Sequence, residues 1–231
     1  MRRAVRENIY WGAKVIKIVV DGQRYQYSAD DIRFIVNEAA RAGVKVAAHV
    51  QTEKGARAAI EAKVASIEHA WIVTDDDLAL AKKNGVALVS TDFTVTQLLS
   101  NGFDRENAER IHAMRIERLK RAYKAGVIIV FGTDIMNNLR NPSRGTQALE
   151  YIDSFVEAGV PAPDILRAMT THAAHLLDVD KERGALAPGM AADLIAVPGN
   201  PLEDINTLKS VSFVMKNGIT YRQDRQRQDA N

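Results

Sequence analysis

The chain alternates short apolar runs with amphipathic segments, and this alternation constrains its fold more than any other feature. The runs are rich in Val, Ile and Ala and short enough for buried strands. They lie near residues 14–20, 44–49, 64–68, 86–91 and 127–133. The segments between them, near 30–42, 54–63, 75–84 and 105–125, have helical patterns. This strand–helix order predicts an α/β fold with a parallel sheet covered by helices.

The pattern changes after Asp134. A polar loop is followed by helical segments and then by turn signals that introduce β-strands. Two helices and two strands are expected there, near 145–158, 163–177, 192–197 and 211–216. An Asn217-Gly218 turn then predicts a hairpin. We therefore divide the chain into a partial barrel at 1–185, part of a β-sandwich at 186–222 and a polar tail at 223–231.

Charge and cysteine content exclude several classes of protein. The 31 basic and 29 acidic residues nearly balance, which gives no basis for binding nucleic acid. Cys is absent, so any metal must be held by His, carboxylate or modified Lys. The chain has no apolar stretch of membrane-spanning length and starts without a signal-peptide core. A cytoplasmic protein that acts on a small molecule is the expectation.

Four polar residues lie at or near the ends of the apolar runs: Lys17, His49, His69 and Asp134. In an α/β barrel of the TIM type, (β/α)8, parallel strands bring such residues together at the carboxyl face, where these barrels keep their active sites. Two imidazoles, a carboxylate and a lysine can hold a zinc-type divalent metal. Asp134 could also take a proton from water, and Gly132 would let the backbone approach the site.

Each of these residues also has a plainer interpretation. A lone His is more often structural than a ligand, and Asp134 could cap the next helix. Lys17, on an apolar strand, would be costly to bury as a free ammonium; it would need carbamylation or an ion pair with an acid such as Glu68.

Other polar residues are weaker candidates. Asn137 and Arg140 could bind substrate, although polar loops often look like this without a function. His172 and His175 are spaced for one helix face, and we expect them to have a packing or surface role. His112 lies in a charged helical segment, and we expect it to be solvated.

Six segments, in their order along the chain, resemble the amidohydrolase superfamily, in particular its imidazolonepropionase-like and prolidase-like branch. They are VIKIVVDG, VKVAAHV, ASIEHA, VIIVFGTD, THAAHLLDV and ERGALAPGMAADLIAVPGNPLEDI. The resemblance implies a (β/α)8 barrel with a small β-sandwich, and a centre of one or two divalent metal ions, usually zinc. It implies that Lys17 is a carboxylated bridging ligand and that His49 and His69 are ligands. It implies that Asp134 is both ligand and general base in the hydrolysis of an amide, cyclic amide or dipeptide C–N bond.

The chain departs from the family pattern at its start. It has no His-x-His pair and begins just before the fourth family strand, so we expect about strands 4–8 of the barrel. Reduced or absent activity of the chain alone is expected; the alternative is a non-catalytic fragment or a subunit of a split or oligomeric enzyme. We also expect a homo-oligomer or a missing N-terminal segment, because an incomplete barrel would expose apolar interior around Val15, Val19, Val46 and Ile129.

Overall fold

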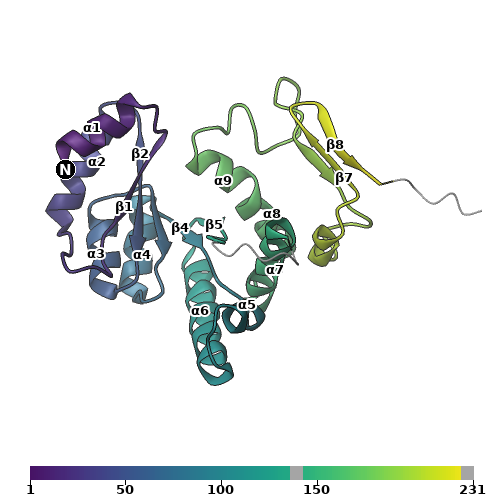
Figure 1. Cartoon of the computed structure of the whole chain (residues 1–231), viewed down its shortest axis with the longest axis horizontal. Helices are drawn as coiled ribbons and strands as arrows, with labels where there is room; N and C mark the ends of the chain where they lie inside the picture. Colours follow the sequence, from purple (N-terminus) through teal and green to yellow (C-terminus); the bar gives the residue numbers. More distant parts are fainter. Residues whose placement is uncertain (136–142, 225–231) are drawn as a thin grey trace, which may run out of the picture.

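The computed structural model describes residues 1–135 and 143–224. Its main feature is a parallel five-stranded sheet in the order β1-β2-β3-β4-β5, so each strand pairs with its successor in the chain (Figure 1). The strands are β1 (Val15–Val19), β2 (Lys45–Val50), β3 (Ser66–His69), β4 (Ala87–Ser90) and β5 (Ile129–Phe131). The predicted fold class, an incomplete parallel α/β barrel, is confirmed.

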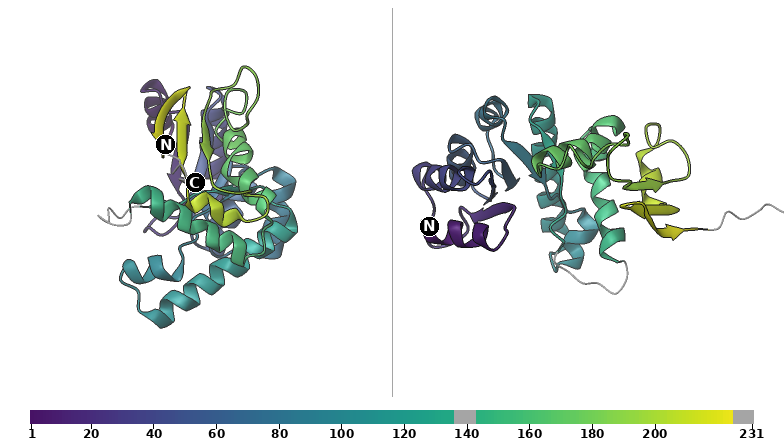
Figure 2. Two further views of the ribbon diagram at one scale, coloured as in Figure 1. Left: turned by 90° about the vertical axis from the view of Figure 1, so that its right-hand side faces the viewer. Right: turned by 90° about the horizontal axis from the view of Figure 1, so that it is seen from above.

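Helices alternate with these strands, as the amphipathic segments predict. They are α1 (Arg2–Tyr10), α2 (Ala29–Ala40), α3 (Glu53–Glu61), α4 (Asp75–Asn84), α5 (Val95–Ser100), α6 (Arg105–Ala125), α7 (Arg144–Glu157), α8 (Ala162–Met169) and α9 (Thr171–Leu176). Figures 1 and 2 show α1 to α4 gathered on one side of the sheet. In the described ranges, no helix combines the length and apolar character that crossing a membrane requires.

Local chemistry explains where several helices begin and end. The side chains of Ser28, Thr74 and Thr94 each accept a backbone hydrogen bond at a helix start, within a capping box. Gly85 and Gly126 end α4 and α6 in the left-handed conformation that glycine adopts without strain. The expected single helix at 163–177 is two helices, because the backbone breaks at Thr170.

The two faces of the sheet are packed differently. Ile16 and Ile18 face the covering helices and are buried, whereas Val19 on the opposite face is 44% exposed. The expectation that Val46 and Ile129 would be exposed is wrong: both are buried in the helix-covered core. Strand alternation places them on the outer face, away from the barrel interior.

Helix α9 covers part of the inner face. A cavity of about 390 Å³ lies between the inward side chains of the strands and Ala173, Leu176 and Leu177 of α9. Lys45 anchors the helix end, because its Nζ donates to the carbonyl oxygens of His175 (2.9 Å) and Leu176 (3.1 Å).

A second, antiparallel sheet follows, in the order β6-β7-β8. Its strands are β6 (Leu194–Ala196), β7 (Phe213–Lys216) and β8 (Ile219–Gln223), with a 3-10 helix, η1 (Ile205–Lys209), between the first two. The hairpin predicted from Asn217-Gly218 joins β7 to β8. The domain boundary near 185 stays a prediction, and most of the expected tail lies outside the described residues.

Candidate metal and substrate site

Two histidines meet at the carboxyl edge of the parallel sheet. His49 lies near the end of β2 and His69 ends β3, and the register pairs Val50 with His69. Their ring centroids are 4.6 Å apart, with the rings nearly perpendicular. Adjacent parallel strands thus bring the two predicted imidazoles together.

His69 is held as a neutral ring. Its Nδ1 lies 2.6 Å from Thr91 Oγ1, and the side chain is buried. Burial, reinforced by the charges of His49 and Lys17, lowers the pKa of His69 to about 3. When Nδ1 donates its proton to Thr91, Nε2 presents a free lone pair to the site, which is the form that binds metals. Burial also lowers the pKa of His49, with Lys17 as the second cause.

Asp134 approaches the same point from the end of β5. Its Oδ2 lies 3.8 Å from His69 Nε2, and its side chain is 53% exposed. Asp134 and His69 both adopt positive φ, at 51° and 67°. This conformation is strained for residues with a Cβ and is often found at functional sites. Asp134 does not cap the next described helix, because Ser143 caps α7.

Lys17 lies on the inner face of β1, close to an acid. Its Nζ is 3.8 Å from Glu68 Oε2, within reach of the ion pair that the sequence offered as the alternative to carbamylation. Burial raises the pKa of Glu68, while Lys17 and the hydrogen bond from Ser66 lower it. The side chain of Lys17 is 48% exposed, because β1 is an edge strand, so its ammonium does not bear the full cost of burial.

These side chains fit a divalent cation in their chemistry. Two imidazoles and a carboxylate are ligands that zinc accepts, and a carbamylated Lys17 would add another oxygen donor. Within residues 1–135 and 143–224, however, no three His, Asp or Glu side chains already close around one point. The structure brings the predicted ligands together as neighbours and leaves their role as ligands a proposal.

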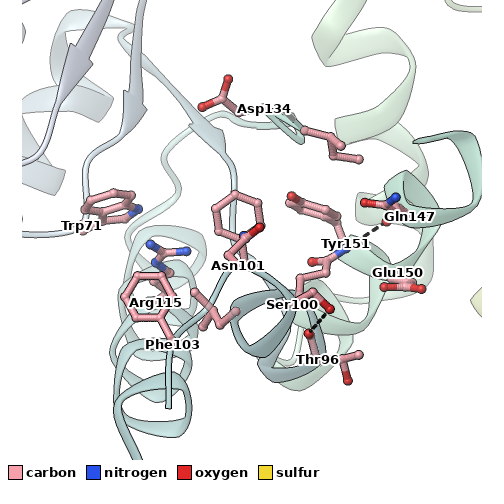
Figure 3. Close-up of a pocket in the computed structure, with 14 residues that line it drawn as sticks. Trp71, Thr96, Ser100, Asn101, Phe103, Arg115, Asp134, Gln147, Glu150 and Tyr151 are labelled. Carbon is pink, nitrogen blue, oxygen red and sulfur yellow. Dashed lines mark hydrogen bonds between the residues drawn. The ribbon is translucent and has the colours of Figure 1, made fainter. Parts of the chain in front are cut away.

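A pocket of about 570 Å³ opens beside Asp134 (Figure 3). Its wall includes Trp71, Phe93, Arg115 and Tyr151, none of which the sequence patterns singled out. Trp71 and Phe93 follow strand ends, which is a usable signal. Arg115 and Tyr151 lie within helices α6 and α7, and only the tertiary fold brings them to the pocket.

A buried ion pair also escaped prediction. Asp92, two residues after β4, accepts hydrogen bonds from Arg118 of α6 and from Ser90 Oγ. Asp92 and Arg118 are each 1% exposed. The triplet Ser90-Thr91-Asp92 after an apolar run was a signal for this pair, since acids there face the carboxyl edge.

The remaining histidines are structural. His112 was expected to be solvated, which is wrong: it is 8% exposed and lies 3.0 Å from the Phe93 carbonyl oxygen and 2.7 Å from Glu157 Oε2. Packing of α6 against α7 buries this face of a charged helix. His172 contacts the carbonyl oxygen of Ile129, and His175 pairs with Asp180 at the surface, as expected for packing and surface roles.

Two predictions from the sequence have different outcomes. Asn137 and Arg140, the candidate substrate-binding residues, lie outside the described residues. Gly132 does permit a close approach, but to the neighbouring strand: a Cβ there would lie 2.5 Å from Val89 Cγ1.

The chain also matches a family model and several known proteins. Residues 2–220 match the family model described as "Amidohydrolase family". Ochratoxinase from Aspergillus niger is 33% identical over 243 residues, covering 96% of this chain and 49% of its own. Imidazolonepropionase from Treponema denticola is 27% identical over 172 residues, covering 73% of this chain and 38% of its own. The chain thus spans about half the length of the ochratoxinase and a smaller share of the imidazolonepropionase.

Solved structures show the same likeness. A Xaa-Pro dipeptidase with bound methionine in its active site has a TM-score of 0.83 at 31% identity, covering 96% of this chain and 57% of that one. The crystal structure of Aspergillus niger ochratoxinase has a TM-score of 0.79 at 31% identity, with coverages of 96% and 54%.

Proposed function

Because the chain belongs to the amidohydrolase family, whose members generally use divalent metals, we propose that it contributes the metal and substrate site of a hydrolase acting on amide, cyclic amide or dipeptide C–N bonds. The observation that carries this proposal is the contact between the His49 and His69 rings, with the Asp134 carboxylate beside them. In this proposal His49, His69 and Asp134 hold the cation, with zinc as the metal, and a carbamylated Lys17 adds a ligand.

The cation, when bound, supplies Lewis-acid polarisation of the substrate carbonyl and activation of water. Asp134 takes a proton from the attacking water and delivers it to the leaving nitrogen. The C–N bond then breaks to release an acid and an amine. Its half-exposed position lets Asp134 reach both water and substrate, whereas buried His69 stays neutral and fixed by Thr91.

Metal binding tests the ligand assignment directly. We expect zinc titration by calorimetry to give at most one tight site per chain, abolished in a His49→Ala, His69→Ala double variant. His175→Ala is the matched control, because His175 lies at the surface beside Asp180, and it should leave binding unchanged. Two tight sites per chain that survive the double variant would contradict the assignment.

Hydrolysis of dipeptides and N-acyl amino acids tests the role of Asp134. Any turnover by the zinc-loaded chain should be lost in Asp134→Asn, by about 100-fold or more, since general acid–base groups contribute on that order. Activity that survives this substitution would mean that the reaction does not use Asp134.

A second candidate is a non-catalytic piece or a subunit of a split hydrolase. The observation in its favour is the five-stranded sheet, whereas a closed barrel of this kind has eight strands. In that case the chain alone should bind zinc but show little turnover. Adding a polypeptide that carries the strands complementary to β1 and β5 should then restore activity.

A further inference from the structure

The floor of the pocket beside Asp134 carries an unbalanced charge. Arg115 and Arg118 both project inward from α6 and are 5% and 1% exposed. Asp92 is the acid buried with them, but Arg118 and Ser90 Oγ already occupy its two carboxylate oxygens. Within the described ranges, Arg115 forms no ion pair. One buried positive charge therefore lacks a counterion.

Two N–H donors of Arg115 also lack hydrogen-bond acceptors among the described residues. Its Nε and Nη1 are buried and have no partner in the part of the chain that the structure describes. The guanidinium lies 4.4 Å from the ring centroid of Trp71 and 5.3 Å from that of Phe93. These cation–π contacts offset part of the cost of burial but satisfy no N–H donor. An arginine held in this way is ready for an anionic partner.

Two further donors share this wall. Trp71 Nε1 and Tyr151 Oη are buried, and no hydrogen-bond partner for either lies in the described ranges. Figure 3 shows Trp71 and Arg115 on one side of the pocket and Tyr151 on the other. Buried polar groups normally have partners, so three side chains with unmet donors around one cavity indicate a missing acceptor.

The remaining wall defines the shape and charge of that acceptor. Phe93, Leu98 and Phe103 give the cavity an apolar, largely aromatic lining, and its volume of about 570 Å³ accommodates a ring. Asp134 and Glu150 also line it and would repel a doubly charged group. A single negative charge matches the single unpaired guanidinium, and carboxylate oxygens are acceptors for its unmet N–H donors.

We propose that this pocket binds an aromatic group bearing one carboxylate, with Arg115 as the counterion and Trp71 Nε1 and Tyr151 Oη as further donors. That the occupant is part of a substrate rests on the proposed function. The binding itself does not, because it requires neither metal nor turnover.

Tryptophan fluorescence of the metal-free chain tests the proposal. The sequence has two tryptophans, so a Trp11→Phe background leaves Trp71 as the reporter within the pocket. The probes are phenylacetate and its neutral counterpart phenylacetamide. We expect phenylacetate to bind at least about tenfold more tightly, as a charge-assisted hydrogen bond to a buried guanidinium provides. Equal affinity for the two probes, or no binding of phenylacetate, would overturn the proposal.

Substitutions identify the counterion. Arg115→Met should abolish the preference for the acid, and Arg115→Lys should retain part of it because the charge remains without the fork of donors. Arg110→Met is the matched control, an exposed arginine of the same helix, and should change nothing. A preference that persists in Arg115→Met would contradict the assignment.

A separate variant covers the case in which Arg115→Met does not fold. Tyr151→Phe removes one hydroxyl without changing the charge, and it should weaken phenylacetate more than phenylacetamide. An unchanged ratio would count against the proposed donor set. Because these titrations use chelated protein, failure of zinc binding at His49 and His69 would refute the proposed function and leave this result standing.

Discussion

Among single residues, Asp92 has the largest predicted effect on stability. It is the buried ion-pair partner of Arg118, and its charge acts on Arg115 without pairing with it. We expect Asp92→Asn to lower the free energy of unfolding by about 3–5 kcal/mol, because it leaves buried guanidinium charge uncompensated. Urea unfolding measures this effect. Asp75→Asn is the control, since Asp75 pairs with Arg121 at the surface and should cost less than about 1 kcal/mol.

His69 gives a prediction about acid sensitivity. Its pKa in the folded chain is lowered to about 3, while in the unfolded chain it titrates near the ordinary histidine value of 6.5. Between these values the unfolded chain binds the extra proton, so the free energy of unfolding falls as pH falls below 6.5. The free energy of unfolding should therefore fall less steeply between pH 6.5 and 5 in metal-free His69→Asn than in the wild type. This window lies above the pH at which most carboxylates titrate. The surface variant His175→Asn should keep the wild-type slope, and identical slopes in all three proteins would contradict the assignment.

At the scale of elements, the sequence predicted strands better than it predicted side-chain contacts. Buried strands are short apolar runs, and β1 to β5 each fall within one residue of the predicted segments. Helix α5 was missed because its six residues are too few for a clear helical period. The ligand candidates His49 and His69 could be found because strand ends share one edge. Arg115 could not, because its position depends on how α6 packs.

Helix α9 depends on a contact that no local pattern reveals. Lys45, at the start of β2, bonds the last carbonyl groups of α9 and pairs with Asp178 at 2.6 Å. A cation at a helix C-terminus stabilises the helix dipole and meets its unpaired carbonyl groups. Lys45→Met should therefore speed amide hydrogen exchange in 171–176 by roughly tenfold, as loss of a charged hydrogen bond implies. Exchange equal to that of the exposed control Lys54→Met would show that the contact does not hold the helix.

For the whole molecule, the open sheet has the clearest consequence. In the five-stranded sheet β1 and β5 each pair with one neighbour, so each leaves one edge without a strand partner among the described residues. Val19 on the inner face of β1 is 44% exposed. Unpaired edges beside apolar surface promote association between chains. We expect sedimentation velocity to show concentration-dependent oligomers of this chain, and we expect a hydrophobic dye to bind it.

A charge on the open face of β1 should show whether association is driven by the exposed apolar surface or by the unpaired strand edges. Val19→Glu places a carboxylate on the open face, near Lys17, without removing a backbone hydrogen bond of β1. If exposed apolar surface drives the association, this variant should shift the sedimentation profile towards monomer at every concentration. The matched control is Val156→Glu, which charges a residue that is equally exposed, at 44%, but belongs to helix α7 and not to the open face of the sheet. A stable wild-type monomer that binds no dye would show that α9 and the helices protect the open sheet sufficiently by themselves.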